Sequence, residues 1–145
     1  MGVVTSVLAG PFEEGVAAWN RGDYATALQL FLPLAEHGNI RAQALLGFSY
    51  ANGLGVPQDD IEAAKWYQRA ADRGDDIAQY NIGIMHQNGQ GVPRDLVGAY
   101  MWLDLAAMRG HQGAAMDRDR LAKSMTAAQI AEAQELARKW KPKTQ

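Results

Sequence analysis

The stretch LLGFSYANGLGVPQDDIEAAKWYQRAADRG, residues 45–74, decides the fold, because a related stretch follows it 36 residues further along the chain. When residues 42–75 are aligned with residues 78–111, fifteen of the thirty-four pairs are identical. Chance would give only a few identities over this length, so the chain contains an internal duplication.

Each copy predicts two helices. Small and apolar residues recur at intervals of three and four in segments 42–49 and 63–71, which places them on one face of a helix. The alanines allow helices of successive repeats to cross closely, while Trp66 and Trp102, which are equivalent in the two copies, fill the wider gaps. We therefore expect a stack of helix hairpins.

The residues between the two helices are typical of helix ends. Gly53 stops the first helix, because glycine takes the left-handed conformation at no steric cost. Asp59 caps the second helix, and Glu62, three residues later, can complete a capping box. In the second copy Asp95 repeats the cap, but Gly98 cannot complete the box.

These motifs resemble the Sel1-like repeat, a relative of the tetratricopeptide repeat, through its GxGV loop and its W-x-x-x-A-A-x-x-G second helix. The resemblance covers residues 42–110. It implies an all-α, right-handed α/α solenoid of helix hairpins that binds a protein or peptide and is not an enzyme. Compact proteins of this kind are common in bacteria, so the resemblance also implies a bacterial source.

The flanking segments continue the repeat in weaker form. Residues 12–38 keep glycine, aspartate and alanine in register, but the segment is four residues shorter than the others and has no GxGV loop, as in a tetratricopeptide-style repeat. Residues 112–140 are expected to form a divergent capping helix pair, with Thr126 and Gln129 as a capping box for the last helix. The tail, residues 141–145, is expected to fray.

These predictions give a single domain over residues 1–145, with repeats at about 9–40, 41–76 and 77–112 followed by the capping pair. The first residues, MGVVTSVLAG, have two further interpretations: a stub of a processed leader, and a myristoylation pattern from Gly2 to Ser6. Both rest on very little sequence.

The composition argues against several classes of partner. The chain has 14 basic and 16 acidic residues, without the basic surplus that nucleic-acid binding normally needs. It has no apolar run of the roughly 20 residues that span a bilayer, so we expect no membrane insertion. The lack of cysteine excludes disulfides and is compatible with either cytoplasm or periplasm.

No residue pattern predicts catalysis, a cofactor or a metal. The three histidines, His37, His86 and His111, are not spaced as metal ligands, and no serine has a nucleophile elbow. The GxG runs lie between helices, without the strand that a dinucleotide fingerprint requires. Some Sel1-like proteins linked with β-lactam recognition are cysteine-rich, and that framework is absent here.

Partner binding is predicted on the concave surface, which the first helix of each repeat lines in such solenoids. Asn20, Asn52 and Asn88 lie five residues after the helix glycine of their repeats, and a side-chain amide can both donate to and accept from a ligand backbone. The alternative for Asn52 and Asn88 is helix capping. The remaining candidates are Trp19, Phe48, Tyr80, Ile84 and Gln87. The alternative for the aromatic residues is core packing, which is the commoner role of an aromatic at helical spacing, and Phe48 and Ile84 can bridge the two first helices.

The sequence thus favours a protein-interaction adaptor that holds a partner segment in its concave groove. One alternative is a cell-wall-fragment binder or weak hydrolase, which would need a deep pocket and a perturbed carboxylate. Another is a self-assembling unit that forms homo-oligomers through the open ends of the solenoid.

Overall fold

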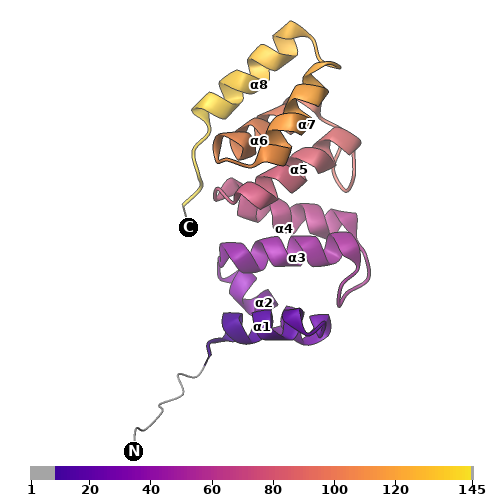
Figure 1. Ribbon diagram of the computed structural model, residues 1–145, viewed down its shortest axis with the longest axis vertical. Coiled ribbons are helices and arrows are strands. Elements are labelled where there is room, and N and C mark those ends of the chain that lie inside the picture. Colours follow the sequence, from indigo (N-terminus) through magenta and orange to yellow (C-terminus); the bar gives the residue numbers. More distant parts are fainter. Residues whose placement is uncertain (1–8, 145) are drawn as a thin grey trace, which may run out of the picture.

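The computed structural model describes residues 9–144, which form eight α-helices and no strand (Figure 1). The helices are α1 (Pro11–Asn20), α2 (Tyr24–Glu36), α3 (Ile40–Asn52), α4 (Asp60–Asp72), α5 (Asp76–Asn88), α6 (Leu96–Met108), α7 (Gln112–Ala122) and α8 (Ala127–Lys139). The predicted all-α repeat fold is confirmed. The leader and myristoylation interpretations concern residues 1–10, of which residues 1–8 lie outside the described part of the chain.

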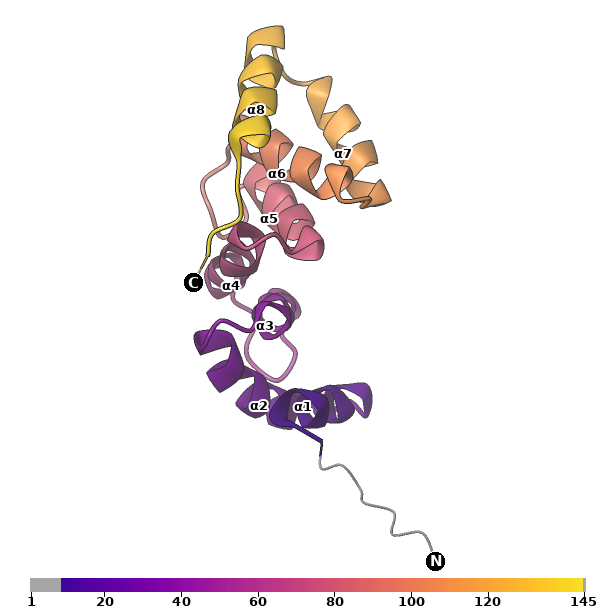
Figure 2. The same ribbon diagram turned by 90° about the vertical axis from the view of Figure 1, so that its left-hand side faces the viewer.

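The hairpins stack into an arc. Helices α1 to α7 pack mainly against their neighbours in sequence, whereas α8 packs mainly against α6. The odd-numbered helices follow the inner side of the arc and the even-numbered helices its outer side (Figure 2). The alanines and the two equivalent tryptophans are buried as predicted, with Trp66 8% and Trp102 6% exposed.

The helix ends largely follow the prediction. Gly53 has a left-handed φ of 64°, and Asp59 accepts hydrogen bonds from the N–H groups of Ile61 and Glu62 at 3.0 and 3.1 Å. The Glu62 carboxylate pairs with Lys65 at 2.8 Å, so it is engaged elsewhere than in the predicted capping box. The capping box of Thr126 and Gln129 at the start of α8 is present.

Each GxGV loop connects the two helices of its own hairpin and contacts the hairpin before it. Gly91 has a φ of +69°, and a Cβ atom there would collide with the backbone carbonyl of Asp60, in the first turn of α4. Gly55 has a φ of +75°, and a Cβ atom there would lie 2.8 Å from the backbone of Tyr24, at the start of α2. Each loop therefore rests on the second helix of the preceding hairpin, and only glycine combines the required conformation with this close approach.

Within each hairpin a large side chain of the second helix lies against a glycine of the first. The three pairs are Phe31 on Gly15, Tyr67 on Gly47 and Leu103 on Gly83. A Cβ at any of these glycines would meet the facing side chain at less than the usual van der Waals distance. In each hairpin, the glycine of the first helix and the large side chain of the second helix therefore determine the distance between the two helices.

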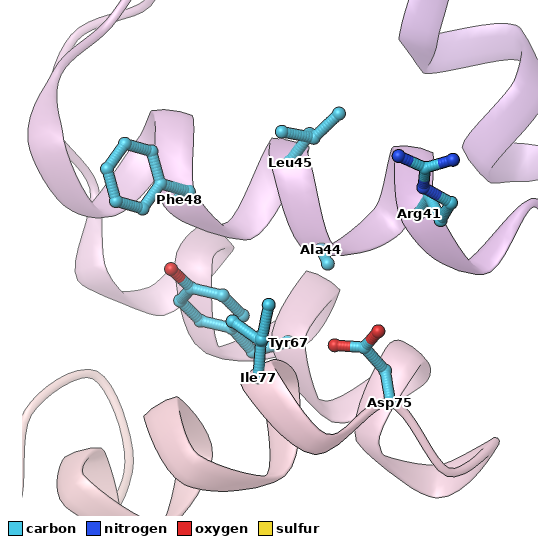
Figure 3. Close-up of a pocket in the computed structure, with 7 residues that line it drawn as sticks. All are labelled: Arg41, Ala44, Leu45, Phe48, Tyr67, Asp75 and Ile77. Carbon is cyan, nitrogen blue, oxygen red and sulfur yellow. The ribbon is translucent and has the colours of Figure 1, made fainter. Parts of the chain in front are cut away.

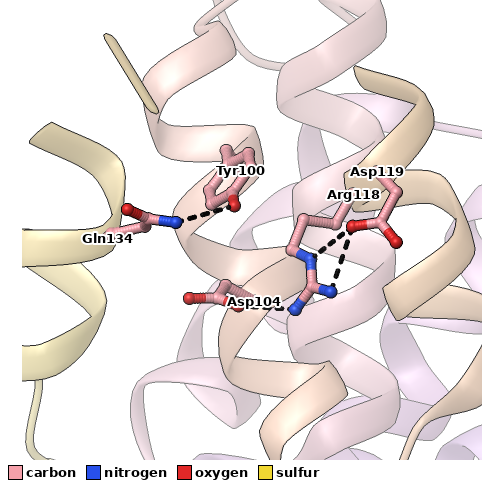
Figure 4. Close-up of polar contacts among 5 residues, drawn as sticks. All are labelled: Tyr100, Asp104, Arg118, Asp119 and Gln134. Atoms are coloured by element: carbon pink, nitrogen blue, oxygen red, sulfur yellow. Dashed lines mark hydrogen bonds and ion pairs between the residues drawn. The ribbon is translucent and has the colours of Figure 1, made fainter. Parts of the chain in front are cut away.

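Polar contacts hold the capping pair in place (Figure 4). Arg118 of α7 forms an ion pair with Asp104 of α6 at 2.7 Å and also contacts Asp119. The Gln134 amide of α8 donates to the Tyr100 hydroxyl of α6 at 3.3 Å. Both α7 and α8 are thus anchored to the last Sel1-like helix.

The prediction of a frayed tail is wrong for residues 141–144. The backbone N–H of Lys143 donates to the carbonyl of Asp72 at 2.7 Å, which fixes the tail against the end of α4. Hydrophobic periodicity does not detect such a contact, because the tail has no regular structure. Gln145 lies outside the described residues.

Candidate binding site on the concave face

Two adjoining pockets lie between α3 and α5 on the inner side of the arc, and we call them together the α3/α5 groove. The first pocket, of about 250 Å³, is lined by Arg41, Ala44, Leu45, Phe48, Tyr67, Asp75 and Ile77 (Figure 3). The second, of about 270 Å³, is lined by Phe48, Ala51, Asn52, Tyr67, Asn81, Ile84, Met85 and Gln90. Phe48 and Tyr67 belong to both, so the pockets are continuous.

The centre of the groove is apolar and open to solvent. Phe48 of α3 is 44% exposed and Ile77 of α5 is 56% exposed, although both are large hydrophobic residues. Phe48 is supported from behind by Trp19 of α1, whose ring centroid lies 6.0 Å away. Two exposed apolar side chains on a pre-formed pocket are typical of a binding surface.

Tyr67 forms the floor of the groove. It comes from α4 and reaches past α3 because Gly47 has no side chain. Its ring is buried, while its hydroxyl points into the pocket (Figure 3). Burial raises the pKa of the Tyr67 hydroxyl, and the carboxylate of Asp75 raises it further. The hydroxyl therefore stays protonated and can donate a hydrogen bond to a ligand.

The first pocket has opposite charges on its two walls. The Arg41 guanidinium lies on the α3 side and the Asp75 carboxylate on the α5 side (Figure 3). One oxygen of Asp75 accepts the N–H of Ala78 at 2.8 Å and so caps α5. Burial raises the pKa of Asp75, with a further contribution from Asp76, while its bond to Ala78 and the charges of Arg109 and Arg41 lower it.

The stability difference between wild type and Asp75→Asn should depend on pH. The folded pKa is raised above the ordinary value of 3.8, so the folded state binds this proton more tightly than the unfolded state. Wild type should lose stability relative to the variant as pH rises from about 4 through the raised pKa, with a constant difference above it. Urea unfolding between pH 3.5 and 7 measures this difference.

Asparagine is itself a good helix cap, so the substitution keeps the bond to Ala78. Asp95→Asn makes the same change at an exposed helix start and controls for the cap alone. A difference between wild type and Asp75→Asn that does not vary with pH would show that burial of this carboxyl has no energetic consequence.

Of the predicted partner-binding residues, Phe48, Asn52 and Ile84 line the groove. The Asn52 amide donates to the Phe48 carbonyl at 2.8 Å, which is the capping interpretation. The side-chain oxygen of Asn52 is the atom that can accept a hydrogen bond from a ligand. Trp19 packs against Phe48 without lining either pocket.

The other predicted residues lie outside the groove. Tyr80 stacks on His111 with centroids 4.4 Å apart, and its hydroxyl donates to Asp117 at 2.7 Å, so it joins α5 to α7. Asn20 and Asn88 are exposed at the last positions of α1 and α5. Gln87 is partly buried, and its backbone carbonyl accepts from Arg94.

Sequence reasoning missed several lining residues, although a signal for them exists. One wall consists of Arg41, Leu45, Phe48 and Asn52. The facing wall contains Ile77, Asn81 and Ile84, which lie 36 residues after the first three. The shared intervals of four and three residues correspond to one face of a helix. The repeat register applied to this face predicts the walls, but not Tyr67, which arrives from another helix.

Among the described residues, no group of three or more His, Cys, Asp or Glu side chains could hold a metal ion. Asp75 is the single acidic residue that lines the groove. In residues 9–144 no helix is both long and apolar enough to cross a bilayer. The groove offers hydrogen-bonding groups around an apolar centre, which suits non-covalent binding.

The fold defines the chain as an α/α solenoid of helix hairpins. Its groove lies between α3 and α5, which are the first helices of two neighbouring hairpins. The family model of the Sel1 repeat matches residues 40–75 and 76–111, so this chain belongs to the proteins with Sel1 repeats. The matched units begin one residue before the predicted repeats at 41 and 77. Sel1 repeats generally serve as protein-interaction scaffolds, and their fold is typically non-enzymatic.

Two solved structures are similar. A protective antigen of uropathogenic Escherichia coli with an SLR fold has a TM-score of 0.83 and 29% identity, over 90% of this chain and 29% of its own. A Sel1 repeat protein from Oxalobacter formigenes has a TM-score of 0.71 and 31% identity, over 76% of this chain and 45% of its own. This chain therefore spans less than half of either structure. No curated protein matches it.

Proposed function

We propose that the protein is an interaction adaptor that holds a segment of a partner protein in the α3/α5 groove. The observation that carries the proposal is the pair of exposed apolar side chains, Phe48 and Ile77, on either side of a pocket with Tyr67 as its floor. A large apolar side chain of the partner fits this pocket, where it removes both residues from water.

The polar groups of the groove suit the backbone of the bound segment. Arg41 and Asp75 lie on opposite walls, and a trans peptide group presents its C=O and N–H in opposite directions. Arg41 can donate to the carbonyl while Asp75 accepts from the N–H. Asn52 and Asn81 provide further polar contacts at the other end of the groove. An apolar centre with a polar rim is the usual anatomy of an interface.

The substitution Ile77→Glu should abolish this binding, because it places a charge in the apolar centre. Wild-type protein is first used to capture partners from a native lysate, and the affinity of the purified partner is then measured by calorimetry. We expect the dissociation constant to rise at least about thirtyfold, the effect of losing an interface hot spot.

Ile61→Glu is the matched control, since Ile61 is 60% exposed on α4 and lies outside both pockets. Circular dichroism should show the same helix content in both variants. The proposal fails when Ile77→Glu binds the partner as tightly as Ile61→Glu does. Absence of any captured protein would direct attention to self-assembly, measured as molar mass against concentration.

A further inference from the structure

The C-terminal tail occupies a surface that shares no residue with the groove. After α8 the chain turns back along the outer side of the arc, past α6 to the end of α4 (Figure 2). Residues 140–144 follow this path without regular secondary structure. We call the surface beneath them the outer lane.

An aromatic residue anchors the start of the tail. The Trp140 ring packs edge to face on Trp102, with centroids 6.1 Å apart, and the Arg109 guanidinium lies 5.9 Å from the Trp140 ring. Pro142 lines the cavity beside them together with Leu105 and Arg109. This end of the lane therefore accepts aromatic and proline side chains.

A basic residue anchors the other end. The Lys143 backbone N–H donates to the Asp72 carbonyl at 2.7 Å, and its ammonium group pairs with the Asp72 carboxylate at 2.9 Å. One residue of α4 thus contacts both the main chain and the side chain of the tail. Main-chain bonds give affinity for an extended segment, and side-chain contacts select its sequence.

The lane uses equivalent positions of the two Sel1 repeats. Leu105, Met108 and Arg109 line the first cavity, and the residues 36 positions earlier, Arg69, Asp72 and Arg73, line the second together with Lys143 and Thr144. The chemistry changes from apolar to charged between the two cavities. The tail changes in the same order, from tryptophan and proline to lysine.

We propose that the outer lane is a second peptide-binding surface, which takes an extended partner segment with the order aromatic, any residue, proline, lysine. In the free protein the chain's own tail holds this surface. The Lys143 pair is exposed to solvent and individually weak, but the tether to α8 keeps the tail at an effective concentration in the millimolar range. A partner segment whose residues follow the same order must displace the tail.

The test uses the full chain and a probe peptide, acetyl-KWKPKT-amide, which copies residues 139–144. The double variant Trp140→Ala/Lys143→Ala removes both anchors and should open the lane. Titration of the ¹⁵N-labelled protein should give a dissociation constant at least tenfold lower for this variant than for wild type. The shifted amides should include those of Asp72, Trp102 and Arg109.

Two controls make the result specific. Lys141→Ala keeps both anchors and should bind the probe as weakly as wild type, and the probe with alanine in place of tryptophan should not bind the open variant. Lys143→Glu replaces the double variant if loss of Trp140 unfolds α8, because it expels the tail by repulsion from Asp72. A correctly folded open variant that shows no saturable shifts overturns the proposal.

Discussion

Replacing Gly91 with alanine should lower the free energy of unfolding by about 3 kcal/mol, of which the positive φ contributes about 1 and the steric conflict the rest. The φ of +69° is unfavourable for a residue with a Cβ atom, and that atom would also collide with the backbone carbonyl of Asp60. Backbone cannot rotate away as a side chain can, so the loop must move off α4. Urea unfolding followed by circular dichroism measures the loss.

Gly22→Ala separates the two contributions. Gly22 has a φ of +81°, but a Cβ there would have no neighbour within 4 Å. We expect a loss of about 1 kcal/mol, the cost of the left-handed conformation alone. Equal losses in Gly22→Ala and Gly91→Ala would show that contact between the loop and the preceding hairpin does not matter for stability.

Most of the fold is predictable from the sequence because both copies of the repeat show the same helix pattern and the same helix ends. Gly53 and Asp59 have their conformations and hydrogen bonds determined by residues next to them, so their roles could be read directly. The contact of the Gly91 loop with Asp60 bridges two hairpins, and nothing local indicates it. The contact of the tail is equally invisible to local sequence patterns, because Asp72, which binds Lys143, lies 71 residues earlier.

The candidate site was predictable only in part. Three of the residues predicted on the concave surface, Phe48, Asn52 and Ile84, line the groove, and partner binding there stays a prediction. Tyr80 was assigned to the same face as Ile84, but its contacts with His111 and Asp117 join it to α7. A helix face about 100° wide touches more than one neighbour, so periodicity alone does not decide which interface a residue at its edge joins.

The groove lies between α3 and α5 because the equivalent spaces are filled by larger side chains. Trp19 of α1 packs against Phe48 and closes the space on one side. On the other side the stack of Tyr80 and His111 spans α5 and α7. Differences at equivalent positions of the repeats therefore leave an open groove at one interface of the stack, so the candidate site depends on particular side chains and not on the fold alone.

The substitution Phe31→Ala should unfold one end of the solenoid selectively. Phe31 is fully buried against Gly15 and Phe12, and removing a buried phenylalanine costs about 4 kcal/mol. Hairpins in such a stack contact mainly their neighbours, so the loss should stay in the hairpin that contains it. We expect amide hydrogens of α1 and α2 to exchange at least a hundredfold faster, while those of α6 and α8 keep their protection.

Leu103→Ala is the matched variant in the second Sel1 repeat, where Leu103 fills the same position against Gly83. It should accelerate exchange in α5 and α6 and leave α1 protected. The two patterns together test whether the hairpins unfold independently. Uniform acceleration across all eight described helices in either variant would show a single cooperative unit.

Selective unfolding of α1 and α2 has a consequence for the proposed binding at the groove. Trp19 of α1 packs against Phe48, so Phe31→Ala should weaken this binding although it changes no residue that lines the groove.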